Sequence, residues 1–168
     1  AYGVTNAHIL AIEVVLADGE IITLGGLDAE PSGYDLRGVF IGGEGMLGIT
    51  TKVAVRITPN PPSVRTLLLS FDTPRDAAAT VSAVIAAGIV PAAMEVMDQG
   101  ITIAVENYVN VGYPRDAGAV LLAEVDGLPD GVDIDAQRIS DIGRQHGATD
   151  VRQAASDEER MLLWKGRK

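Results

Sequence analysis

The stretch Gly42-Gly43-Glu44-Gly45-Met46-Leu47-Gly48-Ile49-Thr50-Thr51 joins a glycine-rich loop to the start of a β-branched segment. Four glycines fall within seven residues, and the β-branched segment then continues to Ile57. Glycine adopts positive φ at little cost and lets a ligand approach the backbone with no Cβ in between. Consecutive amide N–H groups in such a loop can face an anion. The stretch predicts an anion-binding loop or a ligand-free turn, followed in either case by a strand.

The loop also contains the string Gly43-x-Gly45-x-x-Gly48, which matches the dinucleotide-binding fingerprint. That fingerprint needs a helix directly after the glycines, because the pyrophosphate binds at the helix N-terminus. Here valine, isoleucine and threonine alternate with Lys52 and Arg56, a pattern typical of a strand. We therefore reject a nucleotide site of the Rossmann type.

The segment before the loop is predicted to contain a hairpin and a short helix. An Asp18-Gly19 pair lies between two apolar runs rich in β-branched residues, which is a strong hairpin signal. Gly25-Gly26 ends the second of these runs. The predicted elements are strands over 9–16 and 21–24, a loop over 27–33, a short helix over 34–40 and, after the glycine loop, a strand over 49–57.

The run Pro59-Asn60-Pro61-Pro62 is predicted to be a domain boundary, because proline lacks an amide donor and restricts the residue before it. After it, strand–helix–strand occurs twice, separated by a connecting segment. That order predicts an α+β fold with a split βαβ, ferredoxin-like unit: a four-stranded antiparallel sheet with helices on one face. The predicted strands are 64–71, 92–97, 119–125 and 148–154, and the predicted helices are 73–88, 98–109, 132–146 and 156–164.

Three details of this second part can be compared with a structure. Three consecutive leucines indicate that the strand 64–71 is buried on both faces or nearly so. Ser156-x-x-Glu159 is a capping box that begins the last helix. In the helix 98–109, Ile101, Val105 and Tyr108 align on one face.

Composition limits the classes of protein to consider. The chain has 168 residues, 47% of them hydrophobic, a net charge of −10 and no cysteine. The acidic balance and scattered basic residues argue against nucleic acid and anionic membrane as partners. No apolar run is long enough to span a bilayer. The chain begins without methionine and stops within or just past a helix, so we expect a piece of a longer protein.

Three stretches together resemble one family. They are Tyr2-Gly3-Val4-Thr5-Asn6 with the strand that follows it, the glycine loop 42–50, and Trp164-Lys165-Gly166-Arg167. The chain resembles the FAD-linked oxidases of the vanillyl-alcohol-oxidase (PCMH) type, closest to the D subunit of glycolate oxidase and to D-lactate and D-2-hydroxyglutarate dehydrogenases. Gly43 and Met46 stand where the family usually has serine and threonine.

The resemblance implies two domains. Residues 1–58 would be the C-terminal half of a PCMH-type FAD-binding domain, and 63–168 a truncated substrate (cap) domain. It implies oxidation of a small 2-hydroxy acid by hydride transfer to FAD, with Arg167 meeting the substrate carboxylate. No catalytic or metal-binding residue is assigned within the chain, which by itself is expected to be inactive. The residues implied to bind FAD are Tyr2, Gly3, Thr5, Asn6, Gly42, Glu44, Gly45, Gly48, Ile49 and Thr50.

Further expectations follow from the same resemblance. Companion oxidase subunits are implied, with a cytoplasmic location or peripheral attachment at the inner membrane face through those subunits, and a dimer is left open. Two other functions also remain open: a non-catalytic small-molecule-binding module of ferredoxin-like fold, and a different chemistry on the same FAD scaffold.

Glu44 could orient the flavin loop or bond neighbouring amides in a turn. Trp164 is expected to be a core anchor rather than a residue that stacks on a cofactor.

Overall fold

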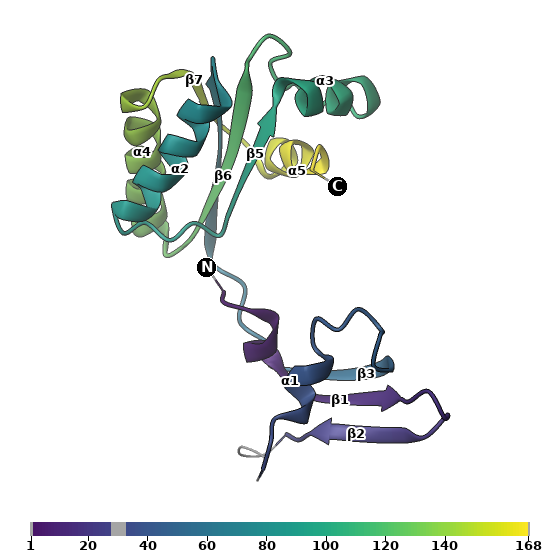
Figure 1. Cartoon of the computed structure of the whole chain (residues 1–168). Helices are drawn as coiled ribbons and strands as arrows, with labels where there is room; N and C mark the ends of the chain where they lie inside the picture. Colours follow the sequence, from purple (N-terminus) through teal and green to yellow (C-terminus); the bar gives the residue numbers. More distant parts are fainter. Residues whose placement is uncertain (1, 28–32, 168) are drawn as a thin grey trace. The chain divides into compact units, whose positions relative to one another are not determined.

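The computed structural model of the chain describes residues 2–27 and 33–167 (Figure 1). These residues form two compact units, one ending at Asn60 and one beginning at Pro61. Residues 28–32 of the predicted loop lie outside the described part of the chain. Among the described residues, no helix combines the length and the apolar character needed to cross a bilayer.

The first unit is built on a three-stranded antiparallel sheet of order β2-β1-β3. The Asp18-Gly19 hairpin forms as predicted, with Val14 opposite Ile22. The glycine loop leads directly into a strand, which confirms that no helix begins at Ile49. The elements are η1 (Thr5–His8), β1 (Ile9–Val15), β2 (Ile21–Gly25), α1 (Leu36–Phe40) and β3 (Ile49–Val55). The one-turn 3-10 helix η1 has no counterpart in the sequence prediction.

The second unit has a four-stranded sheet of order β5-β6-β4-β7 in which every neighbouring pair is antiparallel. This strand order, with α2 and α4 as the two crossovers, is the predicted split βαβ arrangement. Its elements are β4 (Ser63–Phe71), α2 (Pro74–Ala86), β5 (Ala93–Asp98), α3 (Gln99–Tyr108), β6 (Ala119–Gly127), α4 (Pro129–Gln145), β7 (Ala148–Gln153) and α5 (Asp157–Lys165).

Helices cover both faces of this sheet, so the prediction of helices on one face is wrong (Figure 1). Odd-numbered residues of β4 and β6, such as Leu69 and Leu121, pack against α2 and α4. Even-numbered residues, such as Leu68 and Leu122, pack against α5 and the segment that follows α3. The central strands are apolar on both sides, and each side needs a cover.

Of the three aligned residues of α3, only Val105 contacts the core. Ile101 and Tyr108 are exposed, whereas Val105 packs on the core and Glu106 is buried. The Glu106 Oε1 atom accepts hydrogen bonds of 2.9 Å from the amides of Val111, Gly112 and Tyr113. The turn after α3 therefore folds around a buried carboxylate, which satisfies amides that would otherwise lack an acceptor.

Candidate functional site

The glycine loop holds its backbone in a conformation that exposes amides. The φ angles of Gly42, Glu44 and Gly45 are +82°, +49° and +81°. Two internal hydrogen bonds close the loop, from the Gly43 amide to Phe40 and from the Met46 amide to Gly43. Within the described residues, the amides of Glu44 and Gly45 donate to no protein acceptor. Successive amides presented in this way form a concavity that suits an anion.

The side chain of Glu44 points to solvent. Glu44 is exposed, and its carboxylate accepts no hydrogen bond from the described part of the chain. The alternative in which Glu44 bonds neighbouring amides of its own turn is therefore not observed. A positive φ at a residue with a Cβ is strained, and such strain is concentrated at functional sites.

Different glycines of the loop serve different purposes. A Cβ on Gly48 would lie 2.6 Å from Val14 Cγ1 and 2.9 Å from the Val15 carbonyl oxygen, so Gly48 lets the loop pack on β1. By contrast, a Cβ on Gly45 would meet only Ile49 Cδ1, at 3.9 Å. The space beside Gly45 is therefore open. Ile49 and Thr50, which begin β3 after the loop, are exposed.

The predicted N-terminal part of the site forms a short, fixed segment. His8 donates from Nε2 to the carbonyl oxygen of Tyr2 at 2.5 Å, which makes it a structural histidine in the Nε2-protonated tautomer. Gly3 has φ +83°, with no described atom within 4 Å of an added Cβ, and Thr5 and Asn6 belong to η1. Gly3, Thr5 and Asn6 are exposed residues.

Arg37 of α1 ties the helix to the start of β1. Its Nη1 donates to the carbonyl oxygens of Ile9 and Leu10 at 2.6 and 3.3 Å. Asp35 caps α1 by accepting from the Gly38 amide at 3.1 Å, and its carboxylate lies 3.4 Å from Arg37 Nη2. The hydrogen bond from the Gly38 amide lowers the pKa of Asp35 below its ordinary value, and the smaller effect of the Arg37 guanidinium acts in the same direction. The glycine loop therefore begins from a helix that is fixed to the sheet.

In the second unit, Arg167 lies at the end of the described chain and pairs with β5. Its Nε donates to Glu95 Oε1 at 2.8 Å, and just over half of its side chain is exposed. No partner for its terminal Nη atoms occurs among residues 2–27 and 33–167. A cavity of about 330 Å³ lies beside it, lined by Ala93, Glu95, Glu124, Trp164 and Arg167. Arg167 thus retains the two parallel donors that suit a carboxylate.

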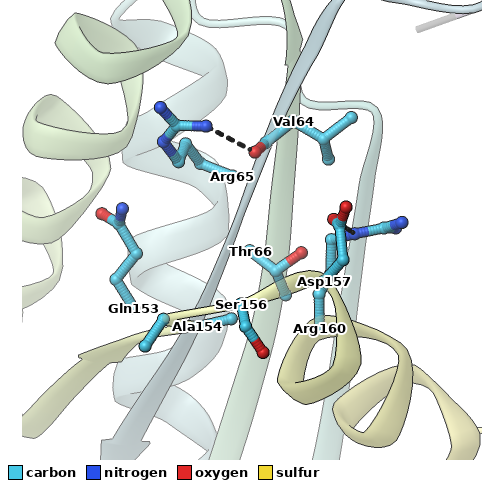
Figure 2. Close-up of a pocket in the computed structure, with 9 residues that line it drawn as sticks. Val64, Arg65, Thr66, Gln153, Ala154, Ser156, Asp157 and Arg160 are labelled. Atoms are coloured by element: carbon cyan, nitrogen blue, oxygen red, sulfur yellow. Dashed lines mark hydrogen bonds and ion pairs between the residues drawn. The ribbon is translucent and has the colours of Figure 1, made fainter.

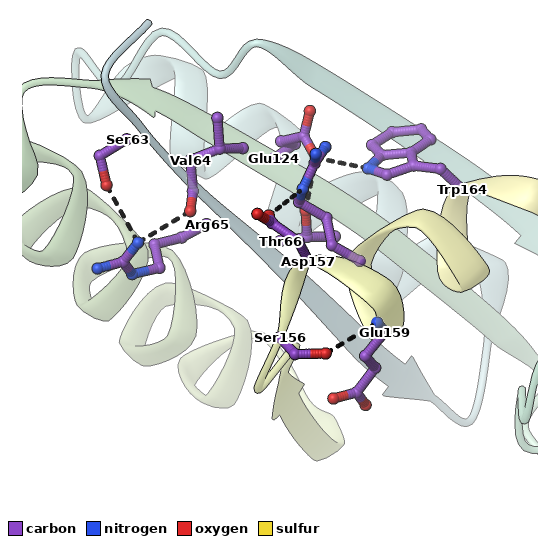
Figure 3. Close-up of polar contacts among 10 residues, drawn as sticks. Ser63, Val64, Arg65, Thr66, Glu124, Ser156, Asp157, Glu159 and Trp164 are labelled. Atoms are coloured by element: carbon purple, nitrogen blue, oxygen red, sulfur yellow. Dashed lines mark hydrogen bonds and ion pairs between the residues drawn. The ribbon is translucent and has the colours of Figure 1, made fainter.

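A polar cluster that the sequence analysis missed is centred on Glu124 (Figure 3), which lines the same cavity as Arg167. Glu124 of β6 accepts on Oε2 from Thr66 Oγ1 at 2.5 Å and from Trp164 Nε1 at 2.6 Å. Arg160 Nη1 lies 3.5 Å from the same oxygen. Trp164 also packs at the margin of the apolar cluster between the sheet and α5, in agreement with its expected role as an anchor. One sequence signal was available: an acidic residue inside an apolar strand needs a partner.

A second cavity, of about 420 Å³, lies between β4 and the start of α5 (Figure 2). Arg65 and Arg160 line it, but both are already paired with acids. Arg65 Nε lies 2.8 Å from Asp133, and Arg160 Nε lies 3.2 Å from Asp157. At the start of α5, Ser156 Oγ accepts from the Glu159 amide at 3.2 Å, and Glu159 Oε2 accepts from the Ala155 amide at 2.7 Å, one residue before the N-cap.

The described residues contain no group of three or more histidine, aspartate or glutamate side chains placed to hold a metal ion. The predicted site residues fall into two groups, one in each unit. Residues 2–6 and the loop 42–50 belong to the first unit, and Arg167 belongs to the second.

Comparisons with known proteins match both units. A family model described as FAD linked oxidases, C-terminal domain, matches residues 60–168. Glycolate oxidase subunit GlcD of Escherichia coli K12 is 46% identical over 167 residues, covering 99% of this chain and 34% of GlcD. A D-lactate dehydrogenase of Anaerostipes hadrus is 32% identical over 171 residues, covering 97% of this chain and 36% of that enzyme.

Among solved structures, p-cresol methylhydroxylase with substrate bound has a TM-score of 0.69 at 16% identity, over 95% of this chain and 37% of that one. At this identity the likeness shows the fold alone. The chain belongs to the FAD-linked oxidases, as the family model and the fold together show. It spans about a third of the length of the curated relatives that it matches.

The described residues fit FAD, the cofactor of this family. The open side of Gly45 and the unpaired amides of Glu44 and Gly45 suit a pyrophosphate, which needs donors and close backbone approach. The close packing of Gly48 on β1 already explains why a glycine is needed there, so Gly48 by itself does not indicate a ligand.

Proposed function

We propose that this chain is part of a flavoprotein that oxidises a small 2-hydroxy acid, of glycolate or D-lactate type, to the 2-oxo acid. The observation that carries the proposal is the 46% identity to GlcD, which extends through both units rather than through the C-terminal domain alone. The relatives are named for glycolate and D-lactate, two acids that share a carboxylate beside a hydroxyl-bearing carbon.

The two units would have different roles. Residues 1–58 would supply the C-terminal half of the FAD-binding domain, and 63–168 the substrate domain. FAD, when bound, accepts the hydride from the substrate. This chain would supply amide donors for the cofactor and a guanidinium for the substrate carboxylate. The residues proposed to hold FAD are Tyr2, Gly3, Thr5, Asn6, Gly42, Glu44, Gly45, Gly48, Ile49 and Thr50.

Arg167 is the residue proposed to bind the substrate carboxylate. Its Nε is held by Glu95, which leaves the Nη atoms for a bidentate contact at the edge of the 330 Å³ cavity. A cavity of that size accommodates an acid of a few heavy atoms. Lysine cannot reproduce the planar pair of donors, so arginine at this position favours a carboxylate ligand.

The proposal includes partners and a location. The E. coli relative is named as a subunit, which supports companion subunits for this protein. We propose a cytoplasmic location, with attachment at the inner membrane face through those subunits as the alternative.

The test uses the full-length protein that contains this chain. It should purify with FAD, and the visible absorbance of the oxidised flavin should bleach anaerobically on addition of glycolate or D-lactate. Arg167→Lys should raise KM for the acid by about tenfold or more, because the bidentate bond is lost, and should leave flavin content unchanged. Arg65→Lys, a change at an arginine already paired with Asp133, is the matched control.

The outcomes separate the proposal from its rivals. A flavin-loaded protein that no 2-hydroxy acid reduces would favour a different chemistry on the same scaffold. A protein without flavin that still binds small metabolites by calorimetry would favour the non-catalytic binding module. Either result overturns the assignment of a hydroxy-acid oxidase.

A further inference from the structure

The last helix, α5, depends on a few specific contacts. It has nine residues, which is too short to be stable by itself in water. Leu163 is its one fully buried side chain within the described chain. Trp164 packs at the margin of the apolar cluster that contains Leu163. Polar contacts add to this packing: the Tyr113 hydroxyl donates to the Leu163 carbonyl, Glu124 accepts from Trp164 Nε1 at 2.6 Å, and Arg160 Nη1 lies 3.5 Å from Glu124.

Glu124 is placed to determine where the Trp164 indole lies. It is directly opposite Thr66 in the sheet register, and both side chains face α5 (Figure 3). Thr66 is 1% exposed and donates to the same Oε2 atom that receives the indole N–H. Because the buried Thr66 hydroxyl holds the Glu124 carboxylate, this acceptor has little freedom to move. The Trp164 indole that donates to it therefore has one preferred position.

Two cavities lie beside Trp164. One, of about 330 Å³, contains Arg167 and Glu95. The other, of about 640 Å³, lies along Met161, Leu162 and Lys165. Trp164 and Glu124 line both. If the indole were released, both cavities would lose part of their lining, and the Arg167 cavity would lose its shape.

Arg167 follows Trp164 by three residues, across a tight passage. A Cβ on Gly166 would lie 2.7 Å from Tyr113 Cε2 and 2.9 Å from Val105 Cγ1. The backbone therefore runs against Tyr113 with no spare room before it reaches Arg167. The Trp164 anchor on one side and this contact on the other fix the direction in which Arg167 leaves α5.

We propose that Glu124 is a positioning residue. By holding the Trp164 indole, it fixes the end of α5 so that Arg167 presents its Nη atoms to the substrate carboxylate. The substrate part of this inference rests on the proposed function of Arg167. The link between Glu124 and Trp164 does not, and it can be tested separately.

The first test uses the present chain, in which Trp164 is the single tryptophan. Glu124→Ala should shift the emission of Trp164 to longer wavelength and increase its quenching by acrylamide, while far-UV circular dichroism shows that the fold persists. Glu124→Gln keeps an acceptor oxygen and should resemble the parent. Glu158→Ala, a change at an exposed acid that lines the larger cavity, is the matched control. Unchanged emission in a folded Glu124→Ala variant would overturn the inference.

The second test uses the full-length flavoprotein. Glu124→Ala should raise KM for the hydroxy acid by about tenfold, the effect of one hydrogen bond to a charged group, with kcat changed by less than about twofold. Trp164→Phe lacks the N–H and should raise KM similarly. The two changes together should cost little more than Glu124→Ala alone, because Trp164→Phe removes a contact that Glu124→Ala has already removed.

The second test also distinguishes a positioning role for Glu124 from other roles. Additive effects of the two changes, or a loss of kcat at constant KM, would contradict a positioning role. If the full-length protein oxidises no 2-hydroxy acid, the roles proposed for Arg167 and Glu124 in substrate binding fail together. The fluorescence result then still shows whether Glu124 holds Trp164.

Discussion

The hydroxyl of Tyr113 donates a hydrogen bond to the main-chain carbonyl of Leu163, fifty residues further along the chain. The bond joins the connection between α3 and β6 to the final helix. Tyr113 is 3% exposed, and burial raises its pKa to about 12, with the negative charge of Glu106 contributing in the same direction. The contact therefore needs the protonated phenol.

The pKa of Tyr113 predicts a loss of stability in alkaline solution. Tyrosine in an unfolded chain ionises near pH 10. Between about pH 10 and 12 the unfolded chain releases this proton while the folded chain retains it, so the free energy of unfolding falls as the pH rises. Below pH 10, Tyr113 is protonated in both the folded and the unfolded chain, so it adds no pH dependence to the stability.

Urea titrations from pH 8 to 12 measure this effect. Tyr113→Phe should lower stability at pH 8 by about 1 kcal/mol, the value of one hydrogen bond, and should decline less steeply above pH 10 than the parent chain. Tyr108→Phe, at a position that is 91% exposed, corrects for the titration of other groups. Parallel declines for the parent and Tyr113→Phe would contradict the prediction.

Glu106 should be among the most sensitive polar positions of the second unit. Glu106→Ala leaves the amides of residues 111–113 without their acceptor and should cost about 3 kcal/mol, since each unsatisfied buried donor carries a penalty. Glu106→Gln retains one acceptor oxygen and should cost about 1 kcal/mol. Chemical denaturation at pH 7 gives both values, with Glu158→Gln as the exposed control. Equal costs for alanine and glutamine would show that the carboxylate does not organise the turn.

The glycine loop should respond differently at two of its positions. Gly48→Ala forces a Cβ against Val14 and Val15 and should destabilise the first unit by about 2 kcal/mol, as overpacking does. Gly45→Ala meets no such clash but keeps φ near +81°, so it should cost about 1 kcal/mol and weaken FAD binding in the full-length protein. Thermal unfolding of the chain and flavin titration of the full-length protein separate the two effects. If Gly45→Ala left flavin binding unchanged, the proposal that the Glu44 and Gly45 amides bind FAD would be wrong.

Arg37 should control the attachment of α1. Arg37→Ala removes the charged donor to the carbonyl oxygens of Ile9 and Leu10, of which Leu10 keeps the Gly26 amide, and should cost about 2 kcal/mol, because hydrogen bonds to a charged group are lost. Hydrogen exchange followed by mass spectrometry should show faster exchange over residues 5–15. Arg56→Ala, an exposed arginine next to β3, is the control. Unchanged exchange in Arg37→Ala would contradict this role.

Local patterns in the sequence predicted most of the elements. Asp18-Gly19 marked the hairpin, the proline run marked a break, and Ser156 with Glu159 marked the start of α5. The start of α4 was predicted three residues late, because Pro129 at the first helical position was not used as a signal. Such features depend on residues close together in sequence, which is why they could be predicted.

Features that depend on tertiary contacts could not be predicted in the same way. The three leucines of β4 already indicated burial on both faces, which conflicts with helices on one face, and the structure resolves the conflict with α3 and α5. Glu106 was not singled out in the sequence, because the amides that donate to it lie in a turn without periodicity. Glu124 meets Thr66 and Trp164 across 58 and 40 residues, and their meeting requires the strand register.

Because β6 is buried on both faces, insertions and deletions within this strand should not be tolerated. Adjacent side chains of β6, such as Ala123 and Glu124, serve opposite faces, so a one-residue insertion or deletion within the strand would exchange them. A carboxylate would then enter the hydrocarbon beneath α2 and α4, and the indole would face an alanine. Tolerated insertions and deletions should therefore fall in the connections, and codon-level length scanning of β6 should return almost no folded products.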